Sequence, residues 1–242
     1  MTILVLIGSV GAGKTTLGKV LESLLSSRGY LSRYIEININ HGFAYLLTLF
    51  LVKLLKYRRI SNYYWTLRFT NVKFFCKYLY LMMVLDALYS PVKILTSLII
   101  FKLIFKLFRK NDCFLILDEY YFTATAEYMY HSLKLCRNPS KILSFFHNIV
   151  FRLALTAIKN DRVMVVYLYT DLSNSIRASI LRDNTIIIDI PHIKYKNYYT
   201  KSIVNTLEKY LKNVQVYRLQ IVNFSNDIIN AIKTLLTSIC AN

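Results

Sequence analysis

The residues with the clearest chemical meaning lie near the beginning of the chain. Gly8-Ser-Val-Gly-Ala-Gly-Lys-Thr15 fits the phosphate-loop pattern G-x-x-x-x-G-K-[ST] without a mismatch. Glycines let such a loop turn its backbone N–H groups toward phosphate oxygens, while Lys14 reaches the outer phosphates and the Thr15 hydroxyl coordinates Mg²⁺. The motif predicts a site for ATP with Mg²⁺, formed by Gly8, Ser9, Val10, Gly11, Ala12, Gly13, Lys14, Thr15 and Thr16.

A second chemical signal is an acidic pair that follows an apolar run. Phe114-Leu-Ile-Leu117 leads directly into Asp118 and Glu119. The carboxyl end of a strand in an open α/β sheet lines the ligand crevice. Asp118 is therefore predicted to share the metal site with Thr15. Many strands end in aspartate, so this interpretation depends on the phosphate loop.

Two arginines provide a third signal. Arg177 and Arg182 lie five residues apart on a predicted helix. A guanidinium is permanently charged and offers a fork of donors to phosphate oxygens. Two of them on a segment that closes over the phosphates would stabilise the charge on a migrating phosphoryl group. The alternative is a solvated helix face.

Strands and helices must position these residues. Residues 2–7 form a short apolar run that predicts a strand buried on both faces, and 17–27 predict a helix whose N-terminal dipole favours an anion. Further strands are predicted at 33–39, 112–117, 162–169 and 214–222. Helices are predicted at 43–57, 71–88, 92–108, 123–135, 139–158, 171–182, 196–211 and 226–239, with a break at Pro91. Alternating strands and helices favour an α/β fold, a parallel sheet with right-handed crossovers.

The segment from about 42 to 111 is unusual in charge. The chain has a net charge of +18, and this segment contains a single acid, Asp86. Its twelve basic residues are Lys53, Lys56, Arg58, Arg59, Arg68, Lys73, Lys77, Lys93, Lys102, Lys106, Arg109 and Lys110. Such a concentration favours an anionic partner, whether nucleotide, nucleic acid or lipid headgroup. A lysine-rich composition throughout the chain is the competing explanation.

The same segment is strongly apolar. Residues 43–52 are too few to cross a bilayer, and charges and Pro91 interrupt the longer run from 79 to 108. A surface helix that buries its apolar side is the simpler interpretation, and contact with an anionic membrane surface is the alternative.

Cysteines and histidines show no spacing typical of a metal site. Cys76, Cys113, Cys136 and Cys240 are scattered, which favours reduced, mostly buried thiols in a cytoplasmic protein. The four histidines, His41, His131, His147 and His192, are interpreted as structural. The apolar N-terminus has no basic leader or cleavage site, so we interpret it as a strand and not a signal peptide.

These motifs, in this order, resemble the thymidylate kinase branch of the nucleoside monophosphate kinases. The resemblance depends on Gly8–Thr16, on Asp118–Tyr128 and on Val165–Arg177. It implies a three-layer P-loop fold with sheet order 2-3-1-4-5, a helical insertion between the second and third strands, and one domain over residues 1–242. It further implies a mobile lid at about 171–190 and catalytic roles for Lys14, Asp118, Arg177 and Arg182.

Two departures from the family pattern concern the acceptor. Glu119 stands where the family has an arginine that holds the acceptor's phosphate. The Arg-Glu-Pro-Gly segment expected after the second strand is replaced by Ile37-Asn-Ile-Asn-His-Gly42. Arg58, Arg59 or Arg68 could supply the missing charge, and the sequence does not choose between them.

Three functions follow from this reasoning. The first is transfer of the ATP γ-phosphoryl group to a nucleoside monophosphate, with dTMP as the expected acceptor. The second is a P-loop ATPase in which Glu119 is the general base and the basic insertion docks on membrane or nucleic acid. The third is nucleotide binding without turnover. A homodimer is a further expected partner arrangement.

Overall fold

The computed structural model describes most of the chain. The described residues are 1–36, 42–58, 63–108, 113–119, 121–137, 161–183, 189–211 and 214–240, with isolated residues between 145 and 158. The helix predicted at 139–158 therefore lies largely outside the described residues, as do residues 37–39 of the predicted second strand.

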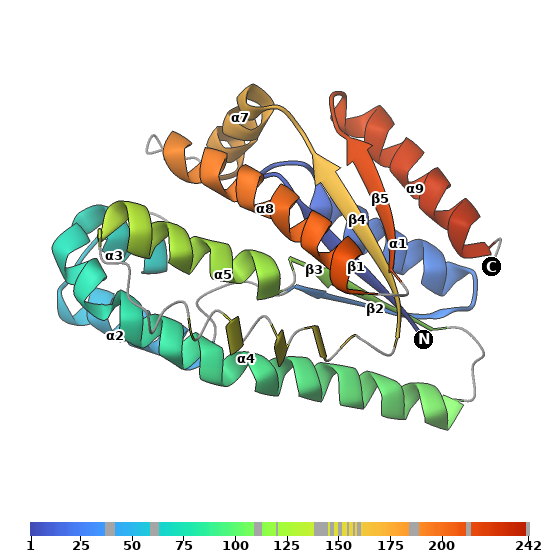
Figure 1. Cartoon of the computed structure of the whole chain (residues 1–242), viewed down its shortest axis with the longest axis horizontal. Helices are drawn as coiled ribbons and strands as arrows, with labels where there is room; N and C mark the ends of the chain where they lie inside the picture. Colours follow the sequence, from blue (N-terminus) through green and yellow to red (C-terminus); the bar gives the residue numbers. More distant parts are fainter. Residues whose placement is uncertain are drawn as a thin grey trace.

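A parallel sheet of five strands forms the centre of the described part of the chain (Figure 1). The strands are β1 (Thr2–Gly8), β2 (Leu31–Glu36), β3 (Cys113–Asp118), β4 (Arg162–Tyr169) and β5 (Val214–Gln220). Their order is β2-β3-β1-β4-β5, and each neighbouring pair is parallel. This confirms the predicted α/β class and the predicted strand order.

The central strand β1 is buried on both faces because its side chains alternate between two cores. Ile3, Val5 and Ile7 belong to one core, and Leu4 and Leu6 belong to the other. The uninterrupted apolar run in the sequence is the expected signature of such a strand. Burial of both faces holds the following phosphate loop on a rigid support.

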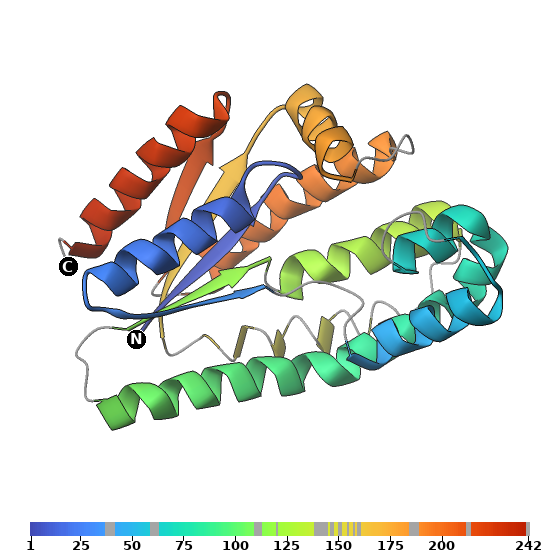
Figure 2. The same ribbon diagram turned by 180° about the vertical axis from the view of Figure 1, so that it is seen from behind.

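Helices cover each face of the sheet. Helices α1 (Lys14–Ser27) and α9 (Phe224–Cys240) pack on the face of Leu4 and Leu6. Helices α8 (Ile190–Tyr210) and α4 (Val72–Phe108) supply the core on the opposite face. Figure 1 shows α8 in front of the sheet, and Figure 2 shows α1 and α9 in front when the molecule is seen from behind. The result is the predicted three-layer arrangement.

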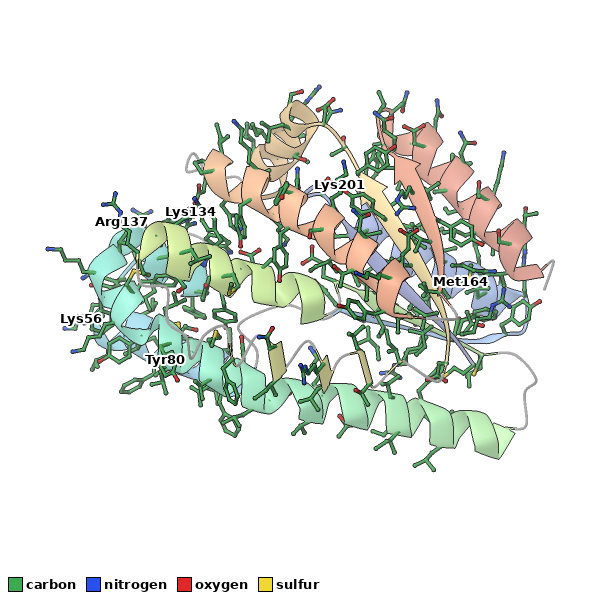
Figure 3. The ribbon with its side chains drawn as sticks, viewed as in Figure 1. Lys56, Tyr80, Lys134, Arg137, Met164 and Lys201 are labelled. Carbon is green, nitrogen blue, oxygen red and sulfur yellow. A yellow bond between two sulfur atoms is a disulfide. The ribbon has the colours of Figure 1, made fainter. Side chains whose placement is uncertain are left out.

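The insertion between β2 and β3 has a core of its own. It contains α2 (Gly42–Leu54), α3 (Tyr63–Thr70) and α4, and α5 (Tyr121–Tyr130) contributes Tyr128 to the same core. A short π-helix, η1 (His131–Leu135), continues α5, and α7 (Leu172–Asp183) follows β4. Lys56 and Arg137 lie at the end of this insertion that is remote from the sheet (Figure 3). The basic segment is thus a helical subassembly beside the sheet.

The predicted helix break at Pro91 is wrong. A continuous helix, α4, runs through this residue and has 37 residues. A proline inside a helix removes one backbone hydrogen bond and crowds the preceding turn, which favours a break in isolation. Here α4 packs on α2 at one end and on the sheet core at the other, through Leu98 and Phe101. We attribute the continuity to this packing.

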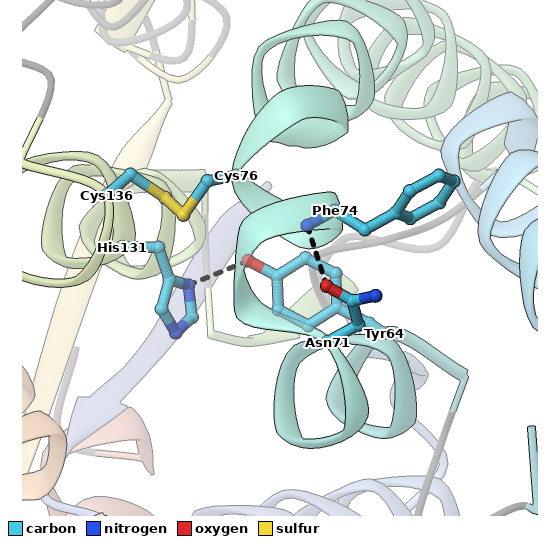
Figure 4. The surroundings of a disulfide bond; sticks show 6 residues. All are labelled: Tyr64, Asn71, Phe74, Cys76, His131 and Cys136. Atoms are coloured by element: carbon cyan, nitrogen blue, oxygen red, sulfur yellow. Dashed lines mark hydrogen bonds between the residues drawn. A yellow bond between two sulfur atoms is a disulfide. The ribbon is translucent and has the colours of Figure 1, made fainter.

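The expectation of reduced cysteines is also wrong for one pair. Cys76 of α4 and Cys136, directly after η1, form a disulfide across 60 residues of sequence (Figure 4). Their Cα atoms lie 5.5 Å apart because α4 and η1 pack side by side. The spacing of the cysteines in the sequence does not indicate this pairing. Cys113, in β3, is buried and is not part of this disulfide.

Among the helices in the described ranges, none combines the length and apolar composition that a bilayer span requires.

Candidate functional site

The phosphate loop connects β1 to α1, and its backbone conformation requires glycine. Gly11 and Gly13 have φ angles of 76° and 83°, in the left-handed region that side chains disfavour. A Cβ atom on Gly11 would lie 2.2 Å from the Cβ of Ala178 in α7. Gly13 is the N-cap residue of α1 and forms no side-chain cap. The first amides of α1 therefore remain available to an anion.

The other predicted loop residues line the same turn. Gly8 ends β1, and the amide of Ser9 donates to the carbonyl of Leu168 in β4 at 2.9 Å. The amide of Val10 donates to the side chain of Asn197 in α8 at 3.3 Å. The amide of Ala12 donates to the Ser9 carbonyl, and Thr16 is exposed in the first turn of α1. Helices α7 and α8 thus both contact the loop.

Lys14 is folded back onto the loop that carries it. Its ammonium group donates to the carbonyl oxygens of Gly8 at 3.2 Å and Ser9 at 2.9 Å. It also pairs with Glu119 Oε1 at 3.2 Å. A phosphate at the loop would offer this ammonium charged oxygens in place of carbonyls, which form the weaker hydrogen bonds.

Asp118 lies directly opposite the first turn of α1. It ends β3 in register with Leu6 of β1, and its Oδ2 accepts hydrogen bonds from Thr15 Oγ1 and Tyr34 Oη, both at 2.6 Å. Its Oδ1 is buried and has no hydrogen-bond partner in the described part of the chain. Burial raises the pKa of Asp118, and the two hydroxyl donors oppose that rise.

This donor set fits Mg²⁺. The cation prefers oxygen ligands and keeps several waters, so one carboxylate and one hydroxyl beside a triphosphate are sufficient protein ligands. The unpartnered Asp118 Oδ1 is the kind of atom that such an ion satisfies. Tyr34 was missed by the sequence reasoning, because a tyrosine within a strand has no local signal of a polar role.

Glu119 has an unusual backbone conformation and two cationic partners. Its φ angle is 53°, which is uncommon for a residue with a side chain. Oε1 contacts Lys14, and Oε2 contacts Lys196 Nζ of α8 at 3.2 Å. Burial raises its pKa, but Lys196 and Lys14 outweigh burial and hold the pKa at about 2. Glu119 is therefore a carboxylate throughout the physiological pH range.

The contacts of Glu119 continue into a buried polar network. Lys196 also pairs with Glu127 Oε1 of α5 at 3.1 Å, and Glu127 Oε2 contacts His192 Nε2 at 2.5 Å. His192 stacks on His131 with the ring centroids 5.7 Å apart. Sequence reasoning did not include Lys196 or Glu127. The spacing of His192 and Lys196, four residues apart on one helix, was the available signal.

His131 extends this network into the insertion. Its Nδ1 shares a hydrogen bond of 2.7 Å with the Tyr64 hydroxyl, as Figure 4 shows. Burial lowers the pKa of His131, and Arg68 lowers it further. The insertion core and the phosphate loop are therefore joined by successive buried polar contacts.

The predicted arginines are placed differently from one another. Arg177 is exposed on α7, next to Ala178, which packs against the phosphate loop. Arg182 lies on the same helix, but its side chain is outside the described part of the structure, and Arg59 is outside it entirely. Arg58 is exposed. The predicted catalytic roles of Arg177 and Arg182 remain predictions.

Of the two insertion candidates that the structure describes, Arg58 is exposed and Arg68 is buried. It is 4% exposed and pairs with Asp189, which precedes α8. Its guanidinium lies over Trp65 at 4.7 Å and over Phe69 at 5.0 Å from the ring centroids. Nε and Nη1 are buried without a partner among the described residues. These two nitrogen atoms are hydrogen-bond donors that the described residues leave unused.

Comparison with known proteins gives structural likeness only. The sequence matches no protein-family model and no curated protein. Deoxyadenosine kinase from M. mycoides with bound dCTP superposes with a TM-score of 0.59 at 12% identity, over 98% of this chain and 100% of the other. The same enzyme with bound dATP gives 0.54 at 13% identity, over 97% and 99% of the two chains.

A thymidylate kinase is also similar. The enzyme from Candida albicans, described as having broad substrate specificity, gives a TM-score of 0.53 at 12% identity, over 98% of this chain and 91% of the other. Identities this low establish the architecture and leave the substrate open. The chain therefore has the P-loop fold of the nucleoside and nucleotide kinases.

Proposed function

We propose that this protein transfers the γ-phosphoryl group of ATP to a nucleoside monophosphate, with dTMP as the first candidate acceptor. The observation that carries the proposal is the pairing of Thr15 with Asp118, whose second carboxylate oxygen is buried and unpartnered beneath the phosphate loop. The kinase fold of the neighbours and the resemblance in three sequence segments support the same reaction.

Each residue has a distinct role in this proposal. The amides at the start of α1 and the Lys14 ammonium bind the phosphates. Thr15 and Asp118 would hold Mg²⁺, which neutralises charge on the transferring phosphoryl group. Arg177 and Arg182, on the segment beside the loop, would add positive charge from the other side.

Arg68 is our candidate for recognition of the acceptor's base. Its charge is balanced by Asp189, so its free Nε and Nη1 donors suit an uncharged acceptor such as a base carbonyl. The aromatic ring of Trp65 stabilises the guanidinium through a cation–π contact. This proposal gives Arg68 a role in base recognition. Which insertion arginine supplies the charge missing at position 119 stays open.

The geometry of Glu119 speaks against the ATPase alternative. A general base must accept a proton near neutral pH, and efficiency falls when its pKa lies far below that range. The two lysines that contact Glu119 hold its pKa at about 2. They also occupy both of its carboxylate oxygens. The kinase proposal needs no proton transfer to this residue.

The test is acceptor-dependent formation of ADP. Purified protein with Mg-ATP is assayed with a panel of nucleoside monophosphates, and with thymidine and deoxyadenosine in parallel. A monophosphate kinase releases ADP only when a monophosphate is present. Lys14→Ala should abolish the reaction, whereas Lys19→Ala, an exposed lysine on the same helix, should leave it unchanged. ADP release without any acceptor, or none with every acceptor, contradicts the proposal.

A further inference from the structure

Lys93 lies in α4, where it meets the carboxyl edge of the sheet. Its ammonium group donates to the backbone carbonyl of Glu36 at 3.2 Å. Glu36 is the last residue of β2 and is in register with Asp118 of β3. Neighbouring strands are about 4.8 Å apart. The ammonium therefore lies at the carboxyl end of β2, the strand that neighbours the one ending in Asp118.

Helix α4 brings Lys93 to the same side of the sheet as Glu119 and Lys196. Leu98 and Phe101 of α4 share a core with residues of α8, the helix that carries Lys196. Figure 1 shows α4 and α8 on one side of the sheet.

Lys14, Lys196 and Lys93 differ in how they are paired. Lys14 and Lys196 each contact a carboxylate, and Lys196 contacts two. Lys93 forms no ion pair in the part of the chain that the structure describes, and its side chain is only partly exposed. Partial burial lowers its pKa, although the charges of Glu36 and Asp86 act in the opposite direction. A bound anion would replace the hydration that this ammonium has lost.

We propose that Lys93 binds the phosphate group of the acceptor and thereby selects a nucleoside monophosphate over a free nucleoside. The inference rests on the proposed kinase function. It accounts for the carboxylate at position 119, because a cation from the insertion takes over the role that the resemblance gives to an arginine there. In this proposal Lys93 contacts the phosphate group of the acceptor, and Arg68 contacts its base.

The experiment compares Lys93→Met with Lys73→Met, which removes an exposed lysine from the same helix. Calorimetry measures the affinities of thymidine and dTMP for each variant, and steady-state assays give KM and kcat. A hydrogen bond to a charged group contributes about 1.5–3 kcal/mol, which corresponds to about 10- to 150-fold in affinity. Lys93→Met should lower the affinity for dTMP by that factor and leave the affinity for thymidine within about twofold of wild type.

Two further measurements complete the test. Lys93→Arg should retain dTMP affinity within about tenfold of wild type, because the charge is preserved. This variant shows whether the loss of dTMP affinity in Lys93→Met comes from the lost charge and not from misfolding. Equal weakening of thymidine and dTMP, or no weakening beyond that of Lys73→Met, overturns the assignment. If wild-type protein phosphorylates thymidine and ignores dTMP, Lys93 has no acceptor phosphate to bind. If wild-type protein phosphorylates neither class of acceptor, the kinase proposal itself fails.

Discussion

A single residue, Glu119, carries the largest chemical departure from the kinase pattern. Its side chain is negative where the resemblance implies a positive one, and Lys14 and Lys196 neutralise it. The negative charge of Glu119 is therefore balanced by residues that lie far apart in sequence. A substitution of Glu119 tests both its ion pairs with the two lysines and whether its carboxylate takes part in the reaction.

We predict that Glu119→Gln leaves acceptor-dependent kinase activity within about tenfold of wild type, because the residue has no proton to accept in that reaction. Steady-state kcat and KM with Mg-ATP and dTMP provide the measurement. Glu208→Gln, at an exposed site on α8, is the control. A large loss of kcat specific to Glu119→Gln would restore the ATPase-type role for this carboxylate.

The same variant has a predictable effect on acid stability. The folded-state pKa of Glu119, about 2, is below the usual value of 4.5, so the unfolded chain binds the proton more readily. This pairing stabilises the fold above about pH 4.5, and the contribution is lost as the pH falls toward 2. Denaturant titrations between pH 7 and 3 should therefore show a shallower decline for Glu119→Gln than for wild type.

At the scale of elements, the junction between β1 and α1 decides whether a phosphate can bind. The loop is held by β4 through Ser9 and by α8 through Val10. Gly13 is the N-cap residue of α1, so no side chain caps the first turn of this helix. These features leave the N-terminus of α1 without a side-chain cap, next to Asp118, and we therefore expect the loop residues to act together.

We predict that Gly13→Ala abolishes Mg-ATP binding, whereas Gly29→Ala does not. Both glycines have a φ of 83°, so each alanine costs about 1–2 kcal/mol of folding stability. A Cβ on Gly13 would lie 2.6 Å from the ring of Phe224, while one on Gly29 meets no atom within 4 Å. Thermal unfolding and calorimetric titration of the two variants separate backbone strain from damage to the loop. Equal ATP affinity in both variants would contradict this account.

At the scale of the whole molecule, α8 connects the phosphate loop to the insertion. Asn197 contacts the loop, Lys196 contacts Glu119 and Glu127, and His192 stacks on His131 in the insertion side of the network. Asp189, just before the helix, pairs with Arg68. Both predicted ligand sites therefore lie against one helix.

We predict that Lys196→Met destabilises the protein by about 3–5 kcal/mol, because it leaves two buried carboxylates without their shared cation. Lys201→Met, an exposed position on the same helix (Figure 3), should change stability by less than about 0.5 kcal/mol. Chemical denaturation gives both values. A small effect at position 196 would mean that Glu119 and Glu127 find other partners, and the network as described would be wrong.

The outer surface of the insertion exposes apolar side chains, and the partners that would bind there remain predictions. Large apolar side chains are exposed on α2 and α4, including Phe43, Phe50, Leu88 and Val92. Contact of this segment with an anionic membrane surface was an alternative interpretation, and a homodimer was an expectation for the chain. Both stay predictions. The lid segment at about 171–190 also remains a prediction. Ala178 of that segment packs against Gly11 of the phosphate loop.

Local patterns in the sequence were sufficient for the sheet and for the backbone conformation of the glycine loop. Continuous apolar runs identify buried parallel strands, and the glycine motif specifies a backbone conformation that few sequences adopt. The predicted meeting of Thr15 and Asp118 follows from the parallel order of β1 and β3. These are properties of neighbouring residues or of strand order, and both can be inferred without coordinates.

Contacts between distant segments were decided only by the tertiary structure. Lys196 beside Glu119, Lys93 beside Glu36 and Cys76 beside Cys136 involve separations of 77, 57 and 60 residues. Each depends on how long helices pack, and helix packing is set by summed apolar contacts over many residues with no local signature. For the same reason α4 continues through Pro91, because packing along its length outweighs the preference of one residue.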